Sequence, residues 1–133
     1  MPTNSVQPGG DAICAVGSFQ NRVRAWHDAC FGERIPSDRE ERCHRFLEEA
    51  VELAQASGCS RDHARLLVEY VYSRRSGTPA RKAGGVMVTL AGLCQASDVD
   101  MVQAGNEELL RNWKRLDQIR AKRSLKRQGS PLP

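Results

Sequence analysis

The chain has 133 residues, 40% of them apolar and 27% charged, with a formal net charge of +4. This length suits about one domain, and the composition is that of ordinary soluble folded domains. No run of about 18 apolar residues occurs, so we expect no membrane span. The N-terminal stretch lacks the pattern of a secretory signal, and five scattered cysteines suit reduced thiols, so we expect a cytoplasmic location.

The positive charge is concentrated near the C-terminal end. The stretch from Arg120 to Arg127 holds five basic residues and no acid, and without it the chain is close to neutral. A terminal run of this kind is more often a solvated helix end than a binding face. We therefore do not expect nucleic acid as a partner, although a small helical nucleic-acid-binding module that uses this end is the alternative from a different class.

The first predicted elements follow a segment rich in proline and glycine, residues 1–17, which we expect to be flexible. Apolar residues at helical spacing predict a helix from Ser18 to about Gly32. Ser37 and Glu40 match a capping box and open a second helix that ends at Gly58. Ser60 or Asp62 caps a third helix, whose apolar side chains are expected to face inward, as are those of the second.

The later elements are also predicted to be helical. Thr78 suits the N-cap of a helix and Pro79 suits its first position. The segment to Ala96 is apolar nearly all round, which is typical of a central helix. Asp100 caps a last helix that continues past Ile119. The fold class is therefore all-α, a bundle of four to five helices, with the domain at residues 18–123 and a C-terminal tail at 124–133.

Three glutamates lie on the second predicted helix. Glu48 and Glu52 are one turn apart and Glu49 lies beside both, all next to the apolar stripe. Like charges at this spacing cost a few tenths of a kcal/mol, which a divalent cation would remove. A solvated helix face with Arg45 as counter-charge explains the spacing more simply, since this pattern is common on surface helices, and the spacing alone favours that interpretation over a metal site.

The stretch DREERCHRFLEEAVELAQASG, residues 38–58, resembles the first motif of the MazG-like all-α nucleoside triphosphate pyrophosphohydrolases, and the small phage and bacterial members in particular. The similarity extends from residue 18 to 133 through SFQNRVRAWHDACFG, GGVMVTLAGLC, AGNEELLRNWKRLDQIRAK and SPLP. The resemblance implies a homo-oligomer, a dimer or tetramer, that cleaves a nucleoside triphosphate, in our expectation a dNTP, to a monophosphate and pyrophosphate. It implies Mg²⁺, with Mn²⁺ as a substitute, held by Glu48, Glu49 and Glu52 as metal-binding and catalytic residues.

The second motif of that family, E-x-x-D, falls here on Lys82-Ala83-Gly84-Gly85. The small phage-like members resemble E-V-G-G at this place, so Lys82 is the true departure. Exchanging a carboxylate for an ammonium beside a cation is unfavourable by Coulomb's law. Lys82 either turns to solvent, or binds the substrate's phosphate directly, or marks a catalytically impaired relative that binds nucleotide or protein.

Other candidate ligands have simpler explanations. Glu69 is a substitute metal ligand or, more simply, a solvated side chain, and Asp98 and Asp100 suit helix capping. His27 with Cys30, and Cys43 with His44, have the side chains that bind zinc but not a familiar spacing. No glycine-rich loop followed by Lys-Ser or Lys-Thr occurs, which excludes a P-loop.

Overall fold

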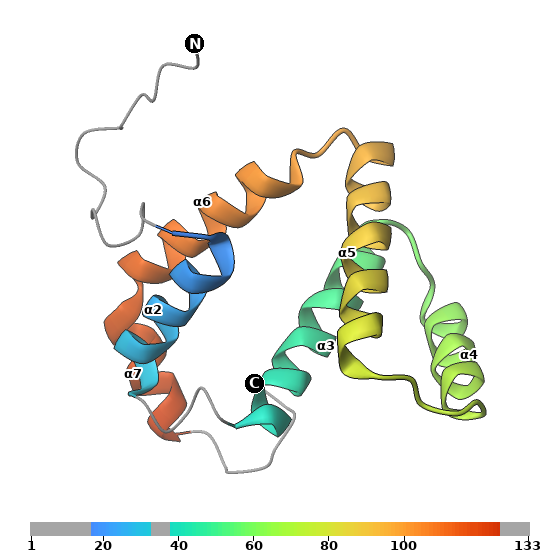
Figure 1. Cartoon of the computed structure of the whole chain (residues 1–133), viewed down its shortest axis with the longest axis horizontal. Helices are drawn as coiled ribbons and strands as arrows, with labels where there is room; N and C mark the ends of the chain where they lie inside the picture. The colour runs from blue at the N-terminus through green and yellow to red at the C-terminus, as the bar shows by residue number, and fades with distance from the viewer. Residues whose placement is uncertain (1–16, 33–37, 126–133) are drawn as a thin grey trace. The chain divides into compact units, whose positions relative to one another are not determined.

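The computed structural model describes residues 17–32 and 38–125 (Figure 1), and in this part of the chain it contains six α-helices and no strand. The all-α prediction is therefore confirmed. The expected N-terminal segment and C-terminal tail fall almost wholly outside the described residues, as does Ser37 of the expected capping box. The helices are α2 (Phe19–Phe31), α3 (Arg39–Ala56), α4 (Arg61–Tyr72), α5 (Pro79–Ala96), α6 (Met101–Lys114) and α7 (Leu116–Leu125).

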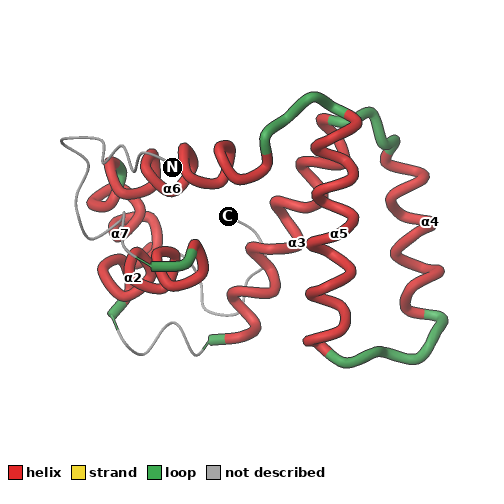
Figure 2. Tube along the Cα trace, turned by 45° about the horizontal axis from the view of Figure 1, so that its top comes forward, coloured by secondary structure: helices red, strands yellow, loops and turns green. Residues whose placement is uncertain are grey.

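The described helices belong to two compact units. Unit 1 contains α2, α7 and nearly all of α6, and unit 2 is Glu40–Met101, which contains α3, α4 and α5. Figure 2 shows that α-helices and short connections make up both units. Each unit is described by itself below.

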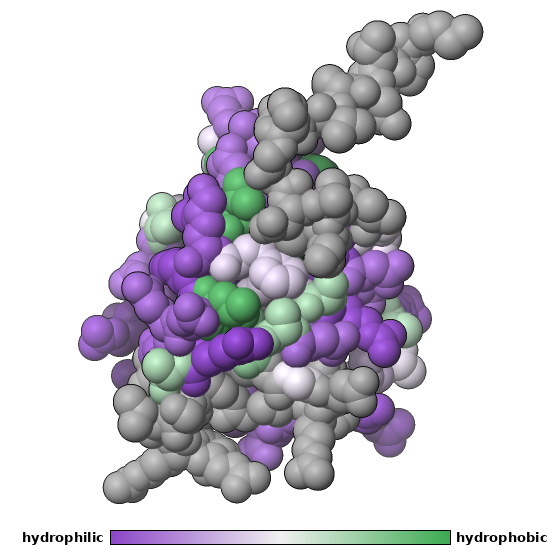
Figure 3. Space-filling view, turned by 90° about the vertical axis from the view of Figure 1, so that its left-hand side faces the viewer, coloured by the Kyte–Doolittle hydropathy of each residue, from purple (hydrophilic) through white to green (hydrophobic). Residues whose placement is uncertain are grey.

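Unit 1 has a small core of its own. The Ser18 side chain accepts a hydrogen bond from the backbone N–H of Asn21 and so caps α2, which ends at Gly32 as predicted. Contacts join this helix to both others, since the Arg22 guanidinium donates to Asn106 of α6 and the Arg120 guanidinium donates to a backbone carbonyl in the last turn of α2. Cys30 and Leu109 are 6% and 5% exposed. The surface drawn in Figure 3 is mostly hydrophilic, with small apolar spots.

The last predicted helix is in fact two. Instead of continuing past Ile119, α6 ends at Lys114, and α7 begins at Leu116. The backbone N–H of Arg115 is shared between the carbonyls of Arg111 and Asn112, a bifurcated arrangement common at helix ends. This break raises the number of helices in the described residues above the predicted four or five.

The turns of unit 2 follow the local chemistry of the sequence. The α3 helix ends in a Schellman motif, in which the N–H of Cys59 bonds to the carbonyl of Ala54 and Gly58 adopts a φ of 91°. Ser60, rather than Asp62, caps α4 by accepting from the N–H of His63. Thr78 and Pro79 open α5 as predicted, although the Thr78 side chain makes no capping hydrogen bond.

The predicted burial of unit 2 is wrong for the single chain. Cys94 is the one buried residue among those described in this unit, at 9% exposed. The apolar side chains expected to face inward from α3 and α4, and much of the expected central helix α5, are exposed; among them are Phe46, Leu47, Val51, Leu67, Val68, Val71, Tyr72, Met87 and Val88. The helical periodicity was right, but the three helices of this unit bring too little surface to cover one another's apolar faces.

Although α5 is so apolar, none of the helices in the two described ranges combines the length and hydropathy required to span a bilayer.

Candidate functional site

The three predicted glutamates lie on consecutive turns of α3. The Arg45 guanidinium donates to Glu48 at 2.7 Å and to Glu41 at 3.2 Å, so Glu48 already has a counter-charge on its own helix. Its side chain is 31% exposed. An i,i+3 pair of this kind stabilises a helix by about 0.2–0.5 kcal/mol. The solvated-face interpretation therefore describes Glu48 well.

Glu52 lies in a different environment one turn later. It lines a pocket of about 520 Å³ at the junction between the end of α3 and the start of α4. Its carboxylate has no hydrogen-bond or salt-bridge partner among the residues that the structure describes. Of the three predicted glutamates, Glu52 alone lines this pocket.

The pocket is built by the turn between the two helices. Because Gly58 reverses the chain, the last turns of α3 face the first turns of α4. Apolar side chains of both helices line it, namely Val51, Ala54, Ala64 and Val68. Polar lining comes from Gln55 at the end of α3 and from Cys59 and Ser60 in the connection to α4. Charged groups supply the remaining lining.

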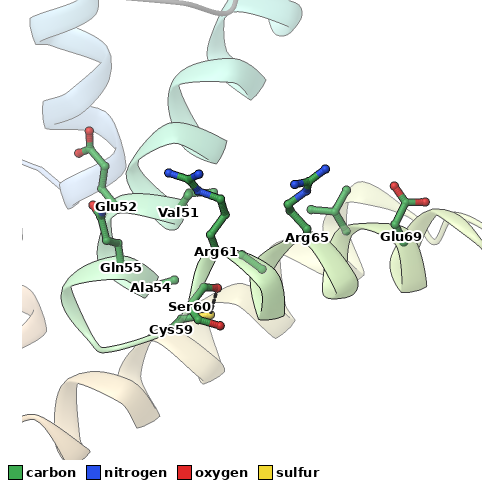
Figure 4. Close-up of a pocket in the computed structure, with 11 residues that line it drawn as sticks. Val51, Glu52, Ala54, Gln55, Cys59, Ser60, Arg61, Arg65 and Glu69 are labelled. Carbon is green, nitrogen blue, oxygen red and sulfur yellow. Dashed lines mark hydrogen bonds between the residues drawn. The ribbon is translucent and has the colours of Figure 1, made fainter.

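Two arginines on α4 are the functional candidates that sequence reasoning missed. Arg61 and Arg65 line the pocket one helical turn apart, and Glu69 follows one turn later. Neither guanidinium has a hydrogen-bond or salt-bridge partner in the described ranges. Figure 4 shows a row of side chains that point to the same side: Glu52, Arg61, Arg65 and Glu69. The signal in the sequence was the four-residue spacing, which is also common on solvated helices.

Lys82, the expected substrate-binding residue, is not part of this lining. Its side chain is exposed and lies along the loop before α5, with Cε 2.5 Å from the place where a side chain on Gly77 would begin. Glu69, which we considered a substitute metal ligand or a solvated side chain, is exposed and lines the pocket. Asp98 adopts a φ of 54° directly after Ser97, the C-cap residue of α5, and does not line the pocket.

In the part of the chain that the structure describes, the acidic residues of α3 do not form a preformed metal cage. Within residues 17–32 and 38–125, no group of three His, Cys, Asp or Glu side chains converges on one point. Mg²⁺ keeps several waters and commonly takes one or two carboxylates plus substrate phosphates. Glu49 and Glu52, at i and i+3 on one helix, provide two such carboxylates.

No protein-family model matches the chain, and no curated protein and no solved structure matches it.

Proposed function

We propose that this chain is a magnesium-dependent, MazG-like nucleoside triphosphate pyrophosphohydrolase that cleaves a nucleotide, preferably a dNTP, between its α and β phosphates. The observation that carries the proposal is the environment of Glu52. This carboxylate has no partner in the described part of the chain, and the pocket that it lines also contains two arginines. The resemblance of residues 38–58 to the first motif of that family supports it.

In the proposed reaction, water attacks the α phosphorus and the bond to the oxygen that bridges α and β breaks. The electron pair of that bond stays on the leaving pyrophosphate, and the proton of the water passes to a base. Glu49 and Glu52 would hold the metal ion, and Glu48 would take the proton or bind a second ion. When bound, Mg²⁺ would neutralise charge on the phosphate oxygens and orient the attacking water.

The working form in this proposal is a homo-oligomer. The apolar surface of unit 2 supports it, because eleven large apolar side chains there are at least 48% exposed: Phe46, Leu47, Val51, Leu66, Leu67, Val68, Tyr70, Val71, Met87, Val88 and Tyr72, the last at 83%. An aromatic side chain buries 150–250 Å². Tyr70 and Tyr72 alone therefore expose roughly 250–300 Å², about a third of what a standard interface takes from each partner.

A second candidate function rests on Lys82. Because an ammonium replaces a carboxylate of the family's second motif, the chain is alternatively a catalytically impaired relative that binds nucleotide or another protein. The exposed position of Lys82 beside Gly77 favours the hydrolase, since a side chain outside the pocket does not oppose a cation inside it.

The test is pyrophosphate release from a panel of dNTPs and NTPs with Mg²⁺. We expect Glu49→Gln and Glu52→Gln each to lower kcat/KM by at least about 100-fold, the scale on which positioned catalytic groups contribute. The isosteric change removes the charge and keeps the volume. Glu107→Gln, at an exposed position on α6 in unit 1, is the matched control and should leave the rate unchanged.

Hydrolysis that persists in both the Glu49→Gln and the Glu52→Gln variant, or that is equally fast in the presence of excess chelator, would contradict the proposal. Absence of hydrolysis with every nucleotide, together with retained nucleotide binding, would favour the impaired relative.

A further inference from the structure

The two arginines of the pocket have no role in the chemistry described so far. Arg61 is the first residue of α4 and Arg65 lies one turn later on the same face. Side by side, two like charges on a helix cost a few tenths of a kcal/mol. The guanidinium of Arg45 on α3, in contrast, is held by two glutamates. A pocket that keeps two guanidinium groups without protein partners is suited to an anionic ligand.

Arginine is suited to phosphate in particular. Its planar fork donates two parallel hydrogen bonds to the oxygens of one phosphate group, and such charge-assisted bonds are about twice as strong as neutral ones. Arg61 also lies at the N-terminus of α4, where the helix dipole favours negative charge. Asp62 in the same first turn and Glu69 in the pocket oppose that effect, so the guanidinium groups themselves carry the argument.

The order of charges selects one class of phosphate ligand. An acid, two bases and an acid follow one another along the pocket, Glu52, Arg61, Arg65 and Glu69 (Figure 4). A lining of arginines alone would suit free phosphate. A polyphosphate carrying a divalent cation presents both signs, with the cation for a carboxylate and the outer oxygens for guanidinium groups.

We propose that Arg61 and Arg65 bind the β- and γ-phosphates of a metal-bound nucleoside triphosphate, in the pocket lined by Glu52. This inference rests on the proposed function for the identity of the nucleotide. When the bond between the α phosphorus and the bridging oxygen breaks, the electron pair moves onto the β-phosphate. Two guanidinium groups at that end stabilise the charge that develops there.

Equilibrium binding to the full chain separates this inference from hydrolysis. The probes are inorganic tripolyphosphate and a dNTP with a methylene group between its α and β phosphates, which is not cleaved at that bond, titrated calorimetrically with Mg²⁺. We expect Arg61→Gln and Arg65→Gln to weaken binding about tenfold each and the double variant about 100-fold. Arg61→Lys and Arg65→Lys should recover part of the affinity, because lysine keeps the charge and loses the fork.

The matched control is Arg75→Gln with Arg81→Gln. This pair removes the same two charges from unit 2 at exposed positions outside the pocket, and should leave the affinity unchanged. Equal loss in both double variants would mean that only net charge matters and would overturn the inference. So would unchanged affinity in a pocket double variant whose thermal unfolding matches the wild type, or no binding by the wild type.

Failure of the two proposals is distinguishable. Binding of tripolyphosphate that requires both arginines, without hydrolysis of any nucleotide, supports the phosphate site and contradicts the hydrolase. Hydrolysis with unchanged kcat/KM in the folded Arg61→Gln, Arg65→Gln variant contradicts the phosphate site alone.

Discussion

At the residue scale, the position of Lys82 gives a prediction that tests whether α5 contributes a side chain to the catalytic site. Because Lys82 lies along Gly77 and does not line the pocket, we expect Lys82→Glu and Lys82→Ala to change kcat/KM less than about threefold, a difference below 1 kcal/mol. Pyrophosphate release under identical Mg²⁺ provides the measurement. A gain of tenfold or more with Lys82→Glu would mean that α5 contributes a carboxylate to the site and that the natural chain is the impaired relative.

Individual residues of the sequence predicted part of the candidate site. The glutamate pattern predicted a helix and a shared face, and α3 has both. It did not separate Glu48, which Arg45 holds, from Glu52, which lies at the pocket. The difference comes from where Gly58 turns the chain. Arg61 and Arg65 were missed for the same reason, because their spacing alone does not show that they line a pocket together with the end of α3.

At the scale of the element, caps and breakers predicted most helix ends. Four helix ends lie where local chemistry predicts them, at Ser18, at Gly32, at Gly58 and at the Thr78-Pro79 pair. The break at Arg115 escaped prediction because Trp113, Leu116 and Ile119 continue the apolar spacing across it. Hydrophobic periodicity indicates which face of a helix is apolar. It does not detect a one-residue break when the apolar residues keep their spacing across the break.

Asp98, just after α5, has a strained backbone conformation, and this gives a prediction about stability. The N–H of Val99 bonds to the carbonyl of Cys94, which makes a Schellman motif with Asp98 at the position that glycine usually takes, at a φ of 54°. A carboxylate at a helix C-terminus is also unfavourable to the helix dipole. We expect Asp98→Gly to raise the free energy of unfolding by about 0.5–1 kcal/mol.

Urea unfolding at one fixed protein concentration measures this effect. Asp98→Asn removes the charge and still tolerates a positive φ, so it should recover part of the gain. Asp98→Ala, which keeps a Cβ in the left-handed region, should show less stability than the glycine variant. A glycine variant less stable than the wild type would mean that the Asp98 side chain contributes more than its backbone strain costs.

At the scale of the whole molecule, the exposed apolar surface of unit 2 is the feature from which we expect a partner. Among its described residues Cys94 is buried and large apolar side chains are exposed on all three helices. Thr89 does not add polarity to α5, because its hydroxyl donates to carbonyls of its own helix. Helices gain most of their stability from packing, so a unit with so small a core is expected to fold against a second copy of the chain.

Substitution on α5 tests this association. Val88 is 73% exposed in the single chain, so a partner that covers it makes Val88→Glu place an unpaired carboxylate in an apolar interface. We expect a shift from dimer or tetramer to monomer, with a dissociation constant raised at least about tenfold, corresponding to about 1.4 kcal/mol or more. Sedimentation velocity over a concentration series measures it. Gln20→Glu, which adds the same charge at an exposed position of unit 1, should leave the assembly unchanged.

A wild-type monomer at every concentration would contradict self-association, and would mean that the apolar faces are covered within one chain. A Val88→Glu variant that assembles as the wild type does would place the interface on the other exposed faces of unit 2, where Tyr72 on α4 is the next position to change.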